Sequence, residues 1–140
     1  MEPHTIEYQI LLQFLVKKDG IKAGNLAKQL GVPHSTINSA LKRMEERQLL
    51  KWNHYGEIQL LEKGNNELQH AEVHHHLIEL FLVDTLNLTP EEAYRESFIL
   101  GPHFSCNVIK RICDKYGHPG TCPLNHPIPY YPACHQHDGE

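Results

Sequence analysis

The stretch STINSALKRMEERQLL, residues 35–50, carries apolar and polar side chains on opposite sides of a predicted helix. Its apolar residues recur at helical spacing and predict a buried stripe of Ile37, Ala40, Leu41 and Met44. The residues between them are small and polar near the start of the helix, which is typical of a helix that reaches base edges in the major groove of DNA. We predict base contacts from Ser35, Thr36, Asn38 and Ser39, and phosphate contacts from Lys42 and Arg43.

The segments around this helix predict a winged helix-turn-helix domain. Two helical patterns precede it, over residues 6–18 and 23–30, and two alternating runs that predict a β-hairpin follow it, over residues 49–52 and 57–60. We therefore expect a DNA-binding domain over residues 1–63. The alternative is a winged helix that serves only for contact with another protein.

Residues 64–130 predict a helical domain, so the expected fold class is mainly α with one small β-hairpin. Helical patterns cover about residues 65–85, 90–101 and 103–116, and Thr89 is the expected N-cap of the second. The first pattern has an apolar cluster that covers more than one helix face, made of Leu77, Ile78, Leu80, Phe81, Leu82, Val83 and Leu86. We interpret this excess as a dimerisation surface, because specific DNA binding usually comes from dimers on paired half-sites. Residues 131–140 are expected to be a C-terminal tail.

Charge separates the two halves of the chain. Residues 1–63 hold nine Lys or Arg and seven Asp or Glu (+2), whereas residues 64–140 hold four and ten (−6), which together give the net charge of −4. This balance argues against a protein that coats nucleic acid, and the mildly basic front half fits a local DNA contact. We see no apolar run that could span a bilayer, no secretory signal and no catalytic motif, so we expect a cytoplasmic protein that is not an enzyme.

All four cysteines lie in the last third of the sequence, at Cys106, Cys113, Cys122 and Cys134. Their spacing, C-x6-C-x8-C-x11-C, differs from the closely spaced pairs of a zinc ribbon. Cys106 and Cys113 would lie ~10.5 Å apart along one helix, too far for a single zinc ion, although His103 could share an ion with Cys106. Because thiolates prefer zinc, copper(I) or iron–sulfur clusters, we predict a cluster or thiolate-bound iron or zinc. The alternatives are a redox thiol switch without metal, or cysteines that serve as small buried residues.

Three stretches resemble the diphtheria toxin repressor / iron-dependent repressor family, which includes the manganese regulators. They are STINSALKRMEERQLL, LLEKGNNELQHAEVHHHLIELFLVDTLNLTPEEAYRES (residues 60–97) and GHPGTCPLNHPIP (residues 117–129). The resemblance covers about residues 5–130 and looks like the short, two-domain form of the family. It implies a homodimeric, metal-activated repressor of metal-uptake genes, whose winged helix binds an operator and whose helical domain dimerises and carries the metal sites.

The resemblance also implies metal ligands, residue by residue. The family's histidine and glutamate on the long helix fall on His75 and Glu79, whose i, i+4 spacing puts them on one helix face. The other family ligand positions fall on residues that are not usual ligands for divalent metals, namely Tyr8, Tyr94, Phe98, Gly101 and Pro102. We therefore expect the family's regulatory site to be largely absent, and the cysteines to replace it.

The resulting hypothesis is a homodimeric, metal- or iron–sulfur-responsive transcriptional regulator. Its expected targets are genes for the uptake of iron or other metals. Its partners would be double-stranded operator DNA and a second copy of the chain. The expected cofactor is an iron–sulfur cluster or iron, with zinc or manganese as the alternative. The other hypothesis is a metal- or cluster-carrying accessory protein whose winged helix contacts a protein partner. Residues that suit base contact in the predicted recognition helix speak against it.

Overall fold

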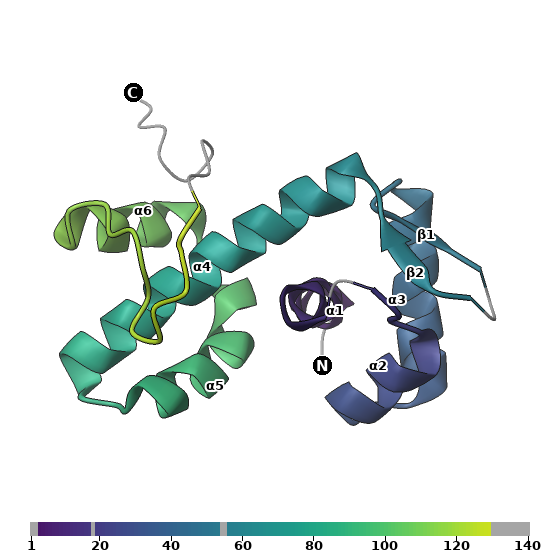
Figure 1. Cartoon of the computed structure of the whole chain (residues 1–140), viewed down its shortest axis with the longest axis horizontal. Coiled ribbons are helices and arrows are strands. Elements are labelled where there is room, and N and C mark those ends of the chain that lie inside the picture. Colours follow the sequence, from purple (N-terminus) through teal and green to yellow (C-terminus); the bar gives the residue numbers. More distant parts are fainter. Residues whose placement is uncertain (1–2, 18, 54–55, 130–140) are drawn as a thin grey trace. The chain divides into compact units, whose positions relative to one another are not determined.

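The computed structural model describes residues 3–17, 19–53 and 56–129, and these form two compact units, Met1–Leu68 and Gln69–Glu140 (Figure 1). Helix α4, Glu62–Leu86, contributes residues to both units. The sequence predicts the domain boundary after residue 63, in the first turn of this helix, whereas Leu68 still packs against the core of the first unit.

The first unit is a winged helix-turn-helix, as the sequence predicts. Its elements are α1 (Pro3–Val16), α2 (Ala23–Leu30), α3 (His34–Glu46), β1 (Leu50–Trp52) and β2 (Ile58–Leu60). The two strands pair antiparallel, with Leu50 opposite Leu60 and Trp52 opposite Ile58. The predicted stripe on α3 is buried in the core, together with apolar residues of the other helices and of the hairpin.

Gly64 allows α4 to begin directly against the hairpin. A Cβ at this position would lie 1.9 Å from the carbonyl oxygen of Leu49, a distance that no side chain tolerates. The same oxygen accepts a hydrogen bond of 2.9 Å from the amide of Leu61. The absence of a side chain at Gly64 therefore fixes how closely α4 approaches the hairpin.

The second unit consists of the remainder of α4, then α5 (Pro90–Leu100), a 3-10 turn (Gly101–His103), α6 (Cys106–Lys115) and a closing segment, residues 116–129. The N-cap prediction for α5 is confirmed, because the Thr89 side chain and the Glu92 backbone and side chain form a capping box. The last helix starts later than predicted. It begins at Cys106 instead of His103, because the Ser105 hydroxyl accepts a hydrogen bond from the amide of Val108 and caps it there.

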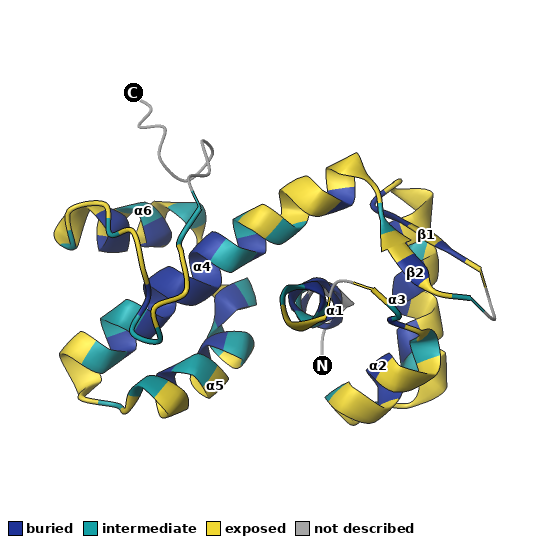
Figure 2. Cartoon of the chain, in the orientation of Figure 1, coloured by how far each residue is buried: buried dark blue, intermediate teal, exposed yellow. Residues whose placement is uncertain are grey.

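The core of the second unit lies along the middle of α4, which Figure 2 shows as a buried stretch. It uses most of the predicted apolar cluster. Three members are buried and three are half-buried against the same core, whereas Leu86 is 62% exposed. Leu86, Ile99 and Val108 are the large apolar side chains that this unit leaves exposed among its described residues. None of the described helices is long and apolar enough to cross a membrane.

Candidate functional site

Helix α3 presents its small polar residues to solvent. Ser35, Asn38, Ser39 and Lys42 are exposed, and Thr36 is half-buried. The four buried residues of the stripe hold the opposite face in the core, so the helix cannot rotate without exposing them. This is the arrangement that a recognition helix requires, and these residues remain the predicted DNA contacts.

Arg43 differs from the other predicted DNA contacts, because it already holds a carboxylate. Its Nε lies 3.0 Å from Oε2 of Glu7, and an Nη of Arg47 lies 2.8 Å from Oε1 of the same residue. The Glu7 side chain is only 11% exposed, so the two arginines neutralise a mostly buried charge and join α1 to α3. Lys42, which is exposed on the same helix, is therefore better placed to contact phosphate.

Three consecutive histidines in α4 are all buried, and they point in different directions. Successive residues of an α-helix are rotated by about 100°. His74 approaches the start of α6, His75 packs against α5, and His76 lies near the closing segment. The run therefore contributes to three groups of potential metal ligands, which we call the carboxylate group, the thiol group and the loop group.

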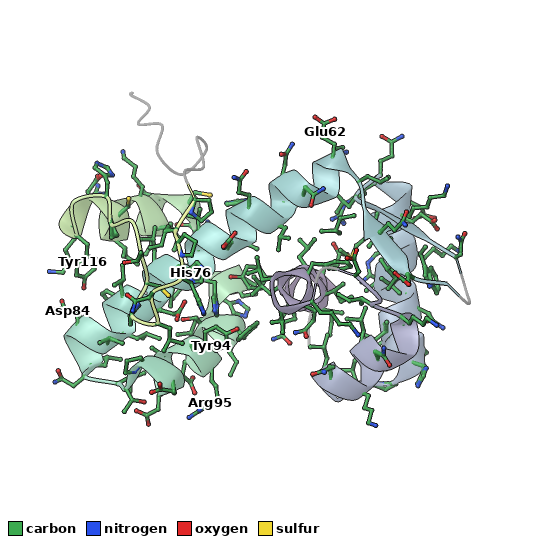
Figure 3. The ribbon with its side chains drawn as sticks, in the orientation of Figure 1. Glu62, His76, Asp84, Tyr94, Arg95 and Tyr116 are labelled. Carbon is green, nitrogen blue, oxygen red and sulfur yellow. The ribbon has the colours of Figure 1, made fainter. Side chains whose placement is uncertain are left out.

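The carboxylate group consists of His75, His76 and Glu79, all buried on α4. Glu79 Oε1 lies 2.7 Å from Nδ1 of His76 and 3.5 Å from Nε2 of His75 (Figure 3 labels His76). His76 also approaches Glu72, with 3.5 Å between Nε2 and Oε2. Burial alone lowers the pKa of His76, but its hydrogen bonds to Glu72 and Glu79 outweigh burial and raise it.

His75 and Glu79 are the least satisfied polar residues of this group. Neither ring nitrogen of His75 forms a hydrogen bond of good geometry with any described residue, and neither does Oε2 of Glu79. Burial, and then the neighbouring His76, lowers the pKa of His75 to about 3, so its imidazole is neutral and able to bind a cation. Buried polar atoms without partners are costly. A divalent cation would satisfy them, so the residues present fit the metal that the family implies.

Two positions where the family resemblance places other ligands do lie beside His75. The ring centroids of Tyr94 and Phe98 are 5.0 and 4.6 Å from that of His75. These aromatic rings provide apolar walls in place of ligand atoms. The group thus offers fewer protein ligands than the family pattern, all from α4.

The thiol group consists of His70, His74 and Cys106. Cys106 Sγ lies 3.2 Å from Nε2 of His70 and 3.6 Å from Nε2 of His74. His74 is buried, and burial together with the nearby His70 lowers its pKa to about 4. His103, which the sequence analysis pairs with Cys106, belongs to the 3-10 turn and to none of the ligand groups in the described residues.

The loop group consists of His76, Cys122 and His126. A tight turn presents the last two, since the amide of Cys122 donates to the carbonyl of His126 and that of Asn125 to the carbonyl of Cys122. Asn125 adopts a positive φ of 65°, which this turn requires. Cys122 is buried, and burial raises the pKa of its thiol, which keeps it protonated in the absence of metal.

The structure places the predicted cysteine ligands at separate sites. Cys106 and Cys122 belong to different groups, and Cys113 is a buried core residue whose Sγ lies 3.2 Å from Nδ1 of His118. Cys134 lies outside the described residues. No ligand group in the described part of the chain contains two cysteines, so this arrangement gives no support to a cysteine-held iron–sulfur cluster.

The sequence analysis missed the histidines that accompany these cysteines. His70, His74, His76 and His126 all enter ligand groups, and Glu72 contacts one of them. The i, i+4 spacing of His70 and His74 was a usable signal, equal to that of His75 and Glu79. The sequence gives no signal that Cys106 and the Cys122 turn lie near these histidines, because this proximity depends on how α6 and the closing segment pack on α4.

Comparison with known proteins matches both the winged helix and the helical domain to known families. The family model described as iron dependent repressor, metal binding and dimerisation domain matches residues 61–130, and a winged helix-turn-helix DNA-binding model matches residues 5–51. The transcriptional regulator MntR of Geobacillus kaustophilus is 26% identical over 114 residues, 81% of this chain and 78% of that protein.

Solved structures share the fold. A manganese-dependent transcriptional repressor in complex with manganese has a TM-score of 0.78 at 25% identity, covering 89% of this chain and 59% of that one. The protein SSo2273 of Sulfolobus solfataricus has a TM-score of 0.68 at 21% identity, covering 93% of this chain and all of that one. The chain thus spans about three fifths of the manganese-dependent repressor. From its winged helix, its buried histidine–carboxylate group and these matches, the chain belongs to the iron-dependent repressor family of metal-dependent, DNA-binding transcriptional repressors.

Proposed function

We propose that this chain is a homodimeric regulator that binds operator DNA through α3 and responds to a divalent cation held by His75, His76 and Glu79. The observation that carries the proposal is the buried, incompletely hydrogen-bonded pair His75 and Glu79, at 1% and 0% exposure. Oε1 of Glu79 is already paired with His76, whereas Oε2 of Glu79 and both ring nitrogens of His75 have no hydrogen-bond partner among the described residues, and a bound cation would satisfy these buried atoms. The dimeric state rests on the family match of the second unit and on its exposed Leu86, Ile99 and Val108.

The ligand chemistry favours manganese(II) or iron(II), with zinc as the alternative. Imidazole suits iron and zinc, and a carboxylate suits manganese. The similar proteins include manganese-dependent regulators and a repressor, ScaR, with bound zinc. Genes for metal uptake are the targets we propose. An iron–sulfur cluster remains the less favoured form of the hypothesis, because each described thiol that lies near potential ligands lies near histidines.

In the proposed mechanism, α4 positions the ligands and the surrounding residues exclude water. When bound, the cation supplies the positive charge that offsets the buried Glu79 carboxylate. His76, whose Nδ1 lies 2.7 Å from that carboxylate without metal, holds it in place and would release its proton to bind the cation, while Tyr94 and Phe98 limit access of solvent to His75. If the DNA-binding conformation of the chain held the cation more tightly than the other conformation, its DNA affinity would rise by the same factor, typically ~5- to 150-fold.

The test compares Glu79→Gln with Glu96→Gln, an exposed residue on α5 that belongs to no ligand group. A duplex is first selected from a random pool with the wild-type protein and manganese. Its affinity is then measured by fluorescence anisotropy with manganese, iron(II) or a chelator. We expect metal to strengthen binding by the wild type and by Glu96→Gln, but not by Glu79→Gln. An unchanged metal response in Glu79→Gln would refute the assignment.

Elemental analysis of protein purified without oxygen decides between ion and cluster. We expect colourless protein without sulfide. Iron together with sulfide would instead restore the iron–sulfur hypothesis, and sedimentation of the same sample would report whether the chain is a dimer.

A further inference from the structure

The thiol group lies on a different side of α4 from the carboxylate group. His70 and His74 are one turn apart and face the first residue of α6, Cys106. His75 follows His74 directly, so the helix rotates it by about 100° toward α5. The two groups share no residue.

The spacing of the three ligand atoms matches a tetrahedral ion. With bonds of about 2.3 Å to sulfur and about 2.0–2.1 Å to nitrogen, a tetrahedral zinc ion separates its sulfur and nitrogen ligands by about 3.5 Å. The two Sγ to Nε2 distances are 3.2 and 3.6 Å, and all three ligand atoms lie within 4.8 Å of one another. Small side-chain adjustments would therefore complete the geometry.

We infer that His70, His74 and Cys106 form a second metal site, which binds zinc in preference to manganese. A thiolate with two imidazoles is a soft to borderline ligand set, which suits zinc, whereas manganese prefers carboxylates and water. Binding breaks the S–H bond of Cys106, releases its proton to solvent and forms the Zn–S bond. The half-buried His70 and Cys106 leave the site accessible, and water fills the fourth position.

The position of this site predicts that a bound ion would link two helices of the second unit. His70 and His74 lie on α4, and Cys106 lies at the N-terminus of α6. A shared ion would join these two helices, which are far apart in sequence and pack in one core. Zinc would therefore stabilise the second unit without involving Glu79. The inference does not depend on the proposed function, because it requires neither the carboxylate group nor DNA binding.

Cobalt(II) is the probe that tests the site in the full chain, because a cobalt–thiolate bond gives a charge-transfer absorption band in the near ultraviolet. We expect the wild type to show this band and zinc to displace it. Cys106→Ser should abolish it. Cys122→Ser, in the loop group, and Glu79→Gln should retain it. His70→Gln should retain the thiol but weaken zinc binding by on the order of 100-fold or more, since even outer-shell changes cost about 10–100-fold.

The outcomes separate this inference from the proposed function. A wild-type protein without the band, or a band that survives Cys106→Ser, overturns the site. A band lost in Cys122→Ser but not in Cys106→Ser assigns the thiolate to the loop group and also overturns it. Circular dichroism checks that Cys106→Ser is folded, and His70→Gln, at a half-buried position, carries the test if it is not. If Glu79→Gln still responds to metal in DNA binding, the proposed function is refuted, but the cobalt result is unaffected.

Discussion

Replacement of Gly64 by alanine should destabilise the winged helix, although the same change inside a helix normally stabilises it. Alanine has the higher helix propensity by about 1 kcal/mol, which favours the variant. The added Cβ, however, would stand 1.9 Å from the oxygen and 2.9 Å from the carbon of the Leu49 carbonyl, and 3.2 Å from Cδ2 of Leu60. Carbon–oxygen contacts are normally at least about 3.3 Å, so the backbone must move by roughly 1 Å or more.

The magnitude follows from what this movement disturbs. Overpacking of a core costs about 1–3 kcal/mol. The displaced carbonyl of Leu49 also accepts the hydrogen bond from Leu61, worth about 0.5–1.5 kcal/mol. After subtraction of the propensity gain, we expect Gly64→Ala to lower the free energy of unfolding by about 0.5–3.5 kcal/mol.

Gly24→Ala is the matched control, because Gly24 lies in α2 and its added Cβ would meet only Cε1 of His34, at 3.8 Å. We expect no loss of stability there, and a gain of up to about 1 kcal/mol. Urea unfolding of metal-free protein, followed by circular dichroism, measures both. If Gly64→Ala proves as stable as the wild type, the close approach of α4 to the hairpin does not constrain the fold, and this reasoning fails.

Three further changes probe other contacts. Lys42→Ala should weaken binding to the selected duplex and reduce its slope of log K against log salt by about 1, measured by anisotropy at several salt concentrations. Thr89→Ala removes the acceptor for the amide of Glu92, 3.1 Å away, and should cost about 1 kcal/mol in urea unfolding, whereas Thr89→Ser should cost less. Burial and the hydrogen bond to Asp84 raise the pKa of Tyr116 to about 12, so its contribution to stability is present below pH 10 and is lost as the pH rises toward 12. Tyr116→Phe should flatten that loss in unfolding measured between about pH 9 and 12, and an unchanged alkaline profile would contradict it.

The sequence was sufficient for the winged helix because its signals are local. Helix α2 has the predicted bounds, Ala23–Leu30, since its apolar spacing and the left-handed Gly31 that ends it both act within a few residues. The family resemblance and the helical spacing also placed His75 and Glu79 together. Local pattern was misleading at Ser105, whose cap delays the start of α6, and at α1, which spans Pro3–Val16 where the pattern predicts residues 6–18.

The ligand groups could not be predicted because they join distant segments. Cys106 meets His70 across 36 residues of sequence, and Cys122 meets His76 only through the turn that ends at His126. Spacing along the chain carries no information about such contacts. It suggested one set of cysteines, whereas packing gives each described cysteine its own histidine neighbours.

Because of the helical rotation, the histidine run offers two different sets of potential ligands on one helix. Adjacent residues in α4 face different neighbours, so His74 is beside a thiol while His75 is beside a carboxylate. Zinc competes strongly with manganese and iron(II) for most ligand sets, because its intrinsic affinity is higher. When zinc is scarcer than the protein, a separate thiolate site that retains zinc would leave the carboxylate group to the ion with the weaker intrinsic affinity. In that case, Cys106→Ser should make DNA binding more sensitive to zinc, and this links the two proposals through a single measurable response.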